Sequence, residues 1–245
     1  IGVHTPEFDF EKEYNNVQKA IEKYNIKYPV VQDNNYKTWT AYKNRYWPRK
    51  YLIDIDGFIV YDHIGEGSYE ETEIKIQELL KERSEVLNLK MDINENVTYE
   101  NFSEDNRYNI GITKETYFGY DYARNQLGNP EGWKPNEIVK YSLPKDPEFD
   151  KFYLSGDWLN NKDNMELKSN EGSILIKYAG KEVNFVSGAE NPIYIEVFIN
   201  EKKVKELTIK DTTLYNLIPR SEYKTQTLRI DINSPGLKAY TFTFG

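Results

Sequence analysis

The chain has 245 residues, a formal net charge of −8 at pH 7 and no cysteine. This acidity excludes a nucleic-acid backbone as the expected partner, because like charges repel. The lack of cysteine removes structural disulfides and thiolate chemistry from these residues, and no apolar run is long enough to cross a membrane. The length allows one large domain or two small ones.

The first third of the chain alternates extended segments with helical patterns. Apolar side chains recur at helical spacing between residues 9 and 24. Asp56-Gly57 is a strong two-residue turn signal, and Ser68 with Glu71 forms a capping-box pattern. We expect, in chain order, a strand at 1–3, a helix at 9–24, an extended segment at 28–31, a helix at 35–42, hairpin arms at 50–55 and 58–63, and a helix at 69–83.

The chain opens in the middle of a strand pattern. Ile1, Gly2 and Val3 form an apolar strand fragment with nothing before it. Strands do not normally begin a domain in this way. We therefore expect these residues to be a fragment of a longer polypeptide.

The apolar period changes near residue 110. Several later segments alternate apolar with polar residues, and Gly, Asn, Pro or Asp stands between them. Such short strands without intervening helices indicate an antiparallel β-sandwich. The expected domains are 1–83 and 108–245, joined by a polar linker at 84–107. The expected strands of the second domain are 173–178, 182–186, 193–199, 205–209, 227–232 and 239–244.

The step Trp47-Pro48 lies at the entrance of the first hairpin arm. Spacing alone favours a proline at the first residue of an edge strand, where its missing N–H does no harm. A proline there also leaves neighbouring backbone groups open to an extended peptide substrate. The residues alone therefore favour the edge-strand interpretation over a substrate-binding one.

A set of motifs in one order carries a family resemblance. The chain resembles the DipZ/TlpA branch of thioredoxin-like thiol–disulfide oxidoreductases, in which a β-sandwich similar to carbohydrate-binding modules follows the thioredoxin-like domain. The resemblance covers nearly the whole chain. It rests on the segments 1–8, 28–31, 46–54 and 63–67 in the first half, and 115–120, 152–158 and 238–245 in the second.

The fold implied by the resemblance has two parts. The first is an α/β thioredoxin-like domain whose N-terminal strand and helix are absent from these residues. The second is an all-β antiparallel sandwich of jelly-roll type. Since the absent strand is central in such a sheet, direct pairing of residues 1–3 with 50–55 would contradict this hypothesis.

The function implied by the resemblance is extracytoplasmic thiol–disulfide exchange, in the periplasm or at the cell surface, through a Cys-x-x-Cys upstream of Ile1. Trp47 and Pro48, the latter in a cis peptide bond, would form the substrate wall, and Glu7 is a candidate proton acceptor. Glu7 has an equally good interpretation as a carboxylate favoured by the helix dipole. The partners would be protein thiols or disulfides and a membrane electron donor, with no cofactor. Without the upstream cysteines the chain would be inactive.

The alternative is a non-catalytic binding protein whose sandwich binds a glycan or a protein partner. A sugar needs exposed aromatic rings beside hydrogen-bonding side chains. The candidates are Trp133, Trp158, Tyr120 and Tyr122, with Asn125 and Gln126 beside them, and Trp133 is the ring expected to be most exposed. Aromatic residues at strand spacing more often pack in a core. A third reading makes the sandwich a structural cover for the first domain.

No metal site is expected. His4 and His63 are the only histidines, and neither has further ligands nearby in the sequence.

Overall fold

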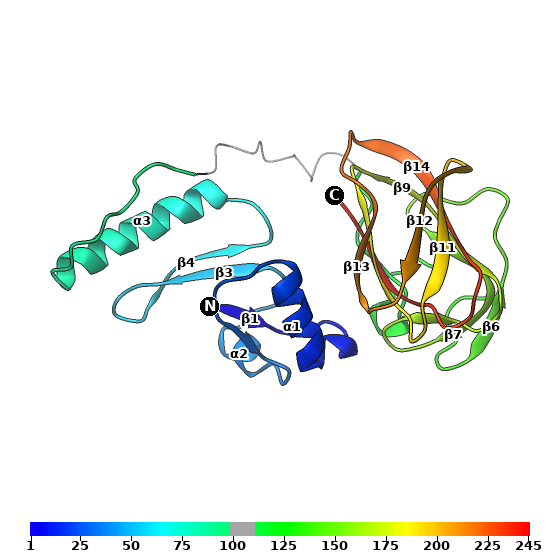
Figure 1. The fold of residues 1–245 in the computed structure, drawn as a ribbon, viewed down its shortest axis with the longest axis horizontal. Coiled ribbons are helices and arrows are strands. Elements are labelled where there is room, and N and C mark those ends of the chain that lie inside the picture. Colours follow the sequence, from blue (N-terminus) through cyan, green and yellow to red (C-terminus); the bar gives the residue numbers. More distant parts are fainter. Residues whose placement is uncertain (99–110) are drawn as a thin grey trace. The chain divides into compact units, whose positions relative to one another are not determined.

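The computed structural model describes residues 1–98 and 111–245, which form two compact units (Figure 1). Unit 1 contains Ile1–Pro6 and the described residues from Lys27 to 98, and unit 2 contains Glu7–Ile26 and the described residues from 111 to Gly245. The segment Glu7–Ile26 therefore belongs to unit 2, although unit 1 surrounds it in the sequence. The boundaries 1–83 and 108–245 stay a prediction, and part of the predicted linker 84–107 lies outside the described residues.

Unit 1 consists of two strand pairs and two helices. β1 pairs with β2 in parallel and β3 pairs with β4 antiparallel, each pair as a separate two-stranded sheet. The pairing of residues 1–3 with 50–55 that would contradict an absent central strand does not occur in the described part of the chain. The elements are β1 (Gly2–His4), β2 (Val30–Gln32), α2 (Lys37–Ala41), β3 (Arg49–Ile53), β4 (Ile59–Ile64) and α3 (Tyr69–Val86).

Side chains close the loop between β3 and β4. The Asp54 carboxylate accepts hydrogen bonds from the backbone N–H groups of Asp56 at 3.0 Å and Phe58 at 2.8 Å. Gly57 adopts φ 91°, a conformation that glycine reaches without steric cost. The hairpin is therefore confirmed, but residues 54–58 connect its strands in place of the expected two-residue turn, and Asp54 organises this loop.

The capping box expected at α3 is wrong. Ser68 is the N-cap, but its side chain makes no capping hydrogen bond and its φ is 46°. The Thr72 hydroxyl instead donates to the Ser68 carbonyl at 2.7 Å. The helix extends to Val86, three residues beyond the expected end at 83.

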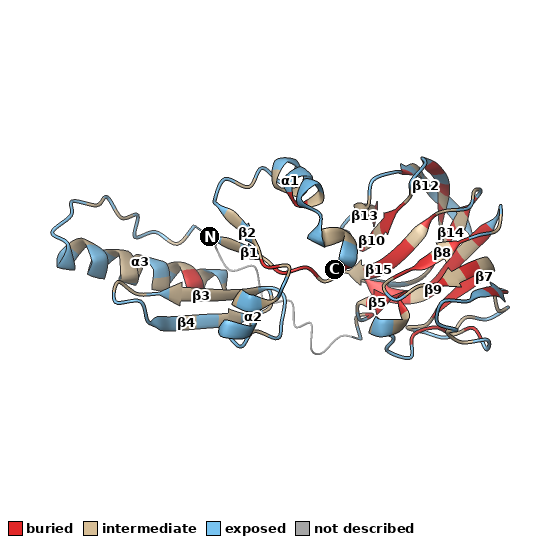
Figure 2. Ribbon diagram, turned by 90° about the horizontal axis from the view of Figure 1, so that it is seen from below, coloured by how far each residue is buried: buried red, intermediate tan, exposed pale blue. Residues whose placement is uncertain are grey.

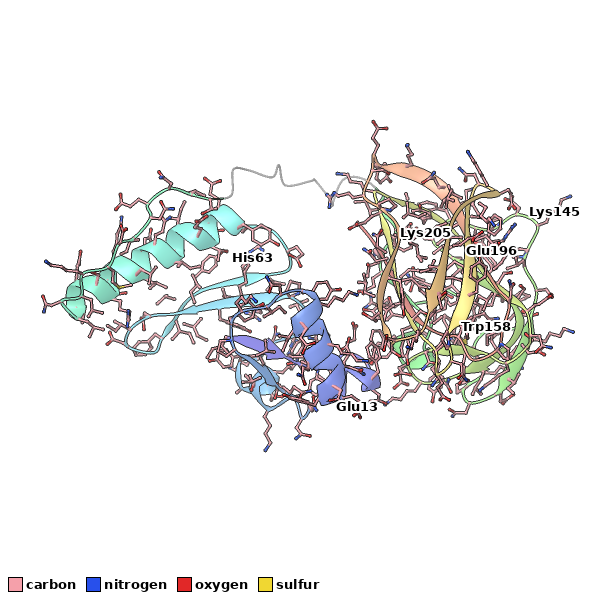
Figure 3. All side chains as sticks on the ribbon, viewed as in Figure 1. Glu13, His63, Lys145, Trp158, Glu196 and Lys205 are labelled. Atoms are coloured by element: carbon pink, nitrogen blue, oxygen red, sulfur yellow. The ribbon has the colours of Figure 1, made fainter. Side chains whose placement is uncertain are left out.

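The helix expected at 9–24 is interrupted. A 3₁₀ helix, η1 (Asp9–Lys12), precedes α1 (Tyr14–Lys23), and the extended residue Glu13 (ψ 119°) separates them (Figure 3). The Glu11 carboxylate accepts from the backbone N–H of Glu7 at 2.6 Å and of Phe8 at 3.3 Å. This carboxylate satisfies donors that the first turn leaves without helical partners.

Unit 2 is a mostly antiparallel, nearly closed, barrel-like sheet. Its principal strand order is β12-β11-β14-β9-β7-β8-β15-β10-β13, with β5 on β15 and β6 on β7. All six expected strands are confirmed, five of them with bounds that differ from those expected. The strands are β5 (Thr116–Tyr117), β6 (Ile138–Tyr141), β7 (Phe152–Asn160), β8 (Met165–Leu167), β9 (Gly172–Gly180), β10 (Val183–Gly188), β11 (Ile193–Ile199), β12 (Lys202–Ile209), β13 (Thr213–Ile218), β14 (Lys224–Ile232) and β15 (Lys238–Phe244).

Aromatic side chains fill the interior of unit 2, where Figure 2 shows most of the buried residues. The ring of Phe118 lies 4.5 Å from Phe152 and 5.2 Å from Phe242, centroid to centroid. Trp158 is fully buried and donates its indole N–H to the Ser155 carbonyl at 2.8 Å (Figure 3). Contacts between such rings stabilise a core beyond the area they bury.

Replacing Trp158 with alanine removes one of the largest side chains of this core. We expect Trp158→Ala to lower the free energy of unfolding by about 3–5 kcal/mol, the usual cost of truncating a buried aromatic residue. Urea unfolding followed by circular dichroism measures this change. Ile138→Ala on the neighbouring strand β6 is the control, since Ile138 is 59% exposed. Equal effects of the two variants would contradict the core position of Trp158.

Candidate functional site

Trp47 and Pro48 form an exposed step at the start of β3 in unit 1. The peptide bond between them is cis, as the resemblance implies. The Pro48 carbonyl accepts a hydrogen bond from the backbone N–H of Gly65 at 2.9 Å, which joins this step to the end of β4. Half of the Trp47 surface is exposed, at 50%. The step therefore offers an aromatic and a proline ring to a ligand.

Two contacts hold the Trp47 ring. Its indole N–H donates to the Thr5 carbonyl at 3.1 Å, and its ring lies 4.2 Å from that of Trp39. Trp39 is fixed in turn by Asp33, whose carboxylate accepts the backbone N–H of Trp39 at 2.8 Å and of Thr38 at 3.0 Å. Burial acts to raise the pKa of Asp33, but these backbone hydrogen bonds outweigh it and hold the pKa below its usual range.

The sequence predicted no role for Trp39. It lies within the expected helix 35–42, and nothing in that segment pointed to a pair with Trp47. Only the folded backbone, which brings α2 to the entrance of β3, shows the pairing of the two indoles.

Glu7 lies in unit 2 among tyrosine side chains. The Tyr117 hydroxyl donates to Glu7 Oε1 at 2.7 Å, and the Tyr122 hydroxyl donates to the Glu7 backbone carbonyl at 2.5 Å. Burial raises the pKa of Glu7 to about 7, and the nearby Glu115 and Glu11 add to this effect. The hydrogen bond from Tyr117 and the charge of Arg124 act in the opposite direction. Glu7 therefore changes its charge near neutral pH, as a proton acceptor needs.

Phe8 fixes the backbone beside Glu7. Its ring is 2% exposed and lies 5.4 Å from Tyr240 and 5.5 Å from Tyr122. The Phe10 ring lies 5.0 Å from Tyr240. Through these two rings, the segment that follows β1 packs against Tyr240 of β15 and against Tyr122, which lies after β5.

The predicted site residues fall into different units. Trp47 and Pro48 belong to unit 1 and Glu7 to unit 2. Each group has a local structure that suits its predicted role, and the roles themselves remain predictions.

The two tryptophans predicted to bind glycan have core positions. Trp158 has no exposed surface, so it cannot stack on a sugar, and its prediction as a binding residue is wrong. Trp133 is half-buried against the core, with its indole N–H donated to the Phe118 carbonyl at 3.0 Å and its ring 6.0 Å from Phe152. It is not the exposed ring that we expected from its loop position.

The remaining glycan candidates do not share one arrangement. Tyr122 stacks on Tyr117 with ring centroids 5.4 Å apart, and the Tyr120 hydroxyl donates to the Asn136 side chain at 3.4 Å. Gln126 is buried, and its amide donates to the Glu115 carbonyl at 3.0 Å, whereas Asn125 is exposed. Gln126 therefore has a structural role beside β5.

Comparison with known proteins identifies the family. The profile described as thioredoxin like C-terminal domain matches residues 113–245. The chain belongs to this family. The matched region comprises the described strands of unit 2 from β5 to β15.

Relatives of this family member extend the likeness to the whole chain. Protein DipZ from Mycobacterium bovis and protein DipZ from Mycobacterium tuberculosis are each 31% identical to it over 246 residues, with 100% of this chain and 34% of the relative covered. The chain thus spans about a third of the length of these relatives. NHL repeat-containing protein 2 from Bos taurus is 34% identical over 71 residues, which cover 29% of this chain and 10% of that protein. The resemblance to DipZ/TlpA-like proteins is confirmed.

One solved structure has a weak similarity to the chain. A carbohydrate-binding module from Clostridium stercorarium in complex with cellobiose is similar at a TM-score of 0.27 and 13% identity, with 48% of this chain and 90% of that chain covered. A similarity this low carries no argument about a ligand.

The described residues contain neither a cluster of metal-binding side chains nor a helix suited to cross a membrane. Within 1–98 and 111–245, no three or more Asp, Glu, His or Cys side chains are placed to hold a metal ion. No helix of the same residues is both long and apolar enough to span a membrane.

The raised pKa of Glu7 predicts a pH-dependent stability difference. The unfolded carboxyl loses its proton near pH 4.5 and the folded one near pH 7. The protonated form of Glu7 therefore makes its full contribution to the free energy of unfolding below pH 4.5. This contribution is lost as the pH rises to 7. Glu7→Gln, which stays neutral, should therefore gain up to about 3 kcal/mol over the wild type across this window, at about 1.4 kcal/mol per pKa unit. Urea unfolding at several pH values measures the difference.

The exposed Glu137 gives the matched control for this experiment. Glu137→Gln should show no such dependence on pH. A constant difference between Glu7→Gln and the wild type from pH 4 to pH 8 would show that the burial of Glu7 does not govern its titration.

Proposed function

We propose that the chain is part of an extracytoplasmic thiol–disulfide oxidoreductase of the DipZ/TlpA type, whose Cys-x-x-Cys lies upstream of Ile1. The observation that carries this proposal is the exposed Trp47-Pro48 step, held in place by Thr5 and Trp39. The match to DipZ over the whole chain supports it. The family supplies the reaction class, and the exposure of Trp47 and Pro48 supports a surface that binds an extended peptide.

We assign to unit 1 an incomplete α/β thioredoxin-like fold and to unit 2 a jelly-roll type of sandwich. Unit 1 keeps many apolar side chains of the β3–β4 hairpin exposed, among them Ile53 at 47%, Phe58 at 69% and Ile59 at 50%. A two-stranded sheet is marginal in water by itself. These strands therefore need a covering surface that the described residues do not supply, which supports an additional strand and helix.

The reaction would proceed by two sulfur displacements. A cysteine thiolate attacks one sulfur of a substrate disulfide, forming a mixed disulfide and releasing the other substrate sulfur as a thiolate, which takes a proton. Glu7 then accepts the proton of the second cysteine, whose sulfur attacks the mixed disulfide. The two cysteines become oxidised to a disulfide and the substrate leaves as a dithiol, and the reverse sequence transfers the electrons the other way. No cofactor is needed.

The Trp47-Pro48 step would bind the backbone beside the substrate disulfide. A flat indole next to a proline ring suits an extended, partly unfolded peptide better than a compact surface. Protein thiols or disulfides are therefore the proposed substrates. By likeness to DipZ, a membrane protein would exchange electrons with the upstream cysteines.

The first test is the intact mass and thiol content of the protein isolated from its natural source. We expect a mass above that of residues 1–245 and two titratable thiols after reduction. A mass equal to these residues alone excludes disulfide exchange, because they contain no cysteine. The function would then be glycan or protein binding by unit 2.

Substitution of Trp47 tests the substrate wall. In the cysteine-bearing protein, Trp47→Ala should raise KM for a disulfide-bonded, partly unfolded protein substrate about tenfold, which corresponds to the loss of an aromatic contact worth about 1.4 kcal/mol. The rate with a small aromatic disulfide should change little, because that substrate does not reach the wall. Initial rates with the two substrates give the comparison.

Tyr46→Ala is the control, because Tyr46 is the neighbouring residue and is similarly exposed, at 52%. It should leave both rates near the wild-type values. Equal losses with both substrates in Trp47→Ala would assign Trp47 to the fold and not to substrate binding.

A further inference from the structure

The carboxylate of Glu7 accepts a hydrogen bond from a residue of the β-sheet of unit 2. Tyr117 stands on β5, 110 residues away in the sequence, and its hydroxyl donates to Glu7 Oε1 at 2.7 Å. The ring of Tyr117 is 2% exposed and packs against Phe8 at 6.2 Å and Tyr122 at 5.4 Å. The packed ring therefore fixes the position of the hydroxyl oxygen beside Glu7, and Glu115 is a second carboxylate that acts on this hydroxyl.

The segment that carries Glu7 is held by unit 2 along its length. Phe8 packs among Tyr117, Tyr122 and Tyr240. Farther on, the Lys19 ammonium lies 2.9 Å from the Asp211 carboxylate, and Lys23 donates to the Leu214 carbonyl of β13 at 3.2 Å. The lysine contacts are exposed and contribute little. The aromatic contacts therefore set the position of Glu7 relative to Tyr117.

We infer that Tyr117 is a positioning residue for the proton acceptor Glu7 in disulfide exchange. This inference rests on the proposed function. The Tyr117 hydroxyl donates a hydrogen bond to Oε1 of Glu7. The other oxygen, Oε2, is then the atom that accepts the proton. A donated hydrogen bond also favours the charged form of a carboxyl group, so Tyr117 keeps Glu7 a usable base despite its burial.

The charged groups around this pair oppose one another. Glu115 and Glu11 favour the neutral form of Glu7, and Arg124 favours the charged form. The Arg124 guanidinium lies 4.7 Å from the centre of the Tyr117 ring. Burial and the two neighbouring glutamates Glu115 and Glu7 raise the pKa of Tyr117 above its usual range, so its hydroxyl keeps its proton as a donor.

A purely structural role for Tyr117 predicts a different result from a positioning role. Tyr122 provides the comparison, because its hydroxyl donates a hydrogen bond to the backbone carbonyl of Glu7 and not to its carboxylate. Both tyrosines pack against Phe8. Loss of either hydroxyl therefore disturbs the same cluster, but only Tyr117→Phe removes the donor to the carboxylate.

The test is a ¹³C NMR titration of the Glu7 carboxyl in the 245-residue chain. We expect Tyr117→Phe to raise the pKa of Glu7 by about one unit, a tenfold change in proton affinity, because a hydrogen bond to a charged group is lost. Tyr122→Phe should leave it near the wild-type value. No change in Tyr117→Phe, or the same change in both variants, overturns the inference.

A second substitution protects the test against misfolding. Site-specific replacement of Tyr117 by 3-fluorotyrosine keeps the ring and makes the hydroxyl a stronger donor. It should lower the pKa of Glu7 relative to the wild type. An increase would overturn the inference even if Tyr117→Phe did not fold.

An exchange assay on the cysteine-bearing protein separates this inference from the proposed function. The midpoint of the rate against pH should move upward in Tyr117→Phe by the shift seen in the titration, and should stay in place in Tyr122→Phe. An active Tyr117→Phe enzyme with an unchanged profile overturns the positioning role. A wild-type protein without exchange activity overturns the proposed function and with it the role in catalysis, whatever the titration shows.

Discussion

The packing of Phe8 among Tyr117, Tyr122 and Tyr240 is the contact on which the organisation of the chain depends. Phe8 follows the strand β1 of unit 1 by only a few residues, yet its ring belongs to the aromatic cluster of unit 2. Aromatic pairs at 5–6 Å add directional preferences to the area they bury. The cluster therefore makes Glu7–Ile26 a part of unit 2, and every property of Glu7 follows from that placement.

The two units reach stability in different ways. Unit 2 buries a continuous set of apolar and aromatic side chains, and the strands of its sheet satisfy one another's hydrogen bonds (Figure 2). Unit 1 has short strand pairs whose apolar side chains stay largely exposed. Its best-defined local structure is polar: Asp33 joins α2 to the Thr5 hydroxyl and Asp54 closes the hairpin loop. Hydrogen bonds thus define the surroundings of Trp47 where apolar burial is small.

Local patterns predicted the elements better than the site. Alternating strands such as β11, and the Asp56-Gly57 turn, follow from period and turn chemistry over a few residues. The break at Glu13 and the burial of Trp158 follow from contacts of distant residues, which one sequence does not reveal. The strands β5, β6, β7, β8 and β13 of the described residues were not predicted, and in β6 only the burial alternates, since Ile138 and Val139 are both apolar. The partners of Glu7 were out of reach, because Tyr117 stands 110 residues away.

In the proposed exchange, a half-buried Glu7 carboxyl that accepts a hydrogen bond from a neutral tyrosine suits proton transfer. Burial alone would leave the group neutral and useless as a base, and a salt bridge would hold it charged and too weak a base. A tyrosine hydroxyl lies between these extremes, because it favours the charged form without bringing a charge of its own. The charges of Glu115 and Glu11 raise the pKa of Glu7 and the charge of Arg124 lowers it, so this pKa lies near 7. Since Tyr117 belongs to β5 and Glu7 to the same unit 2, this balance is set within unit 2.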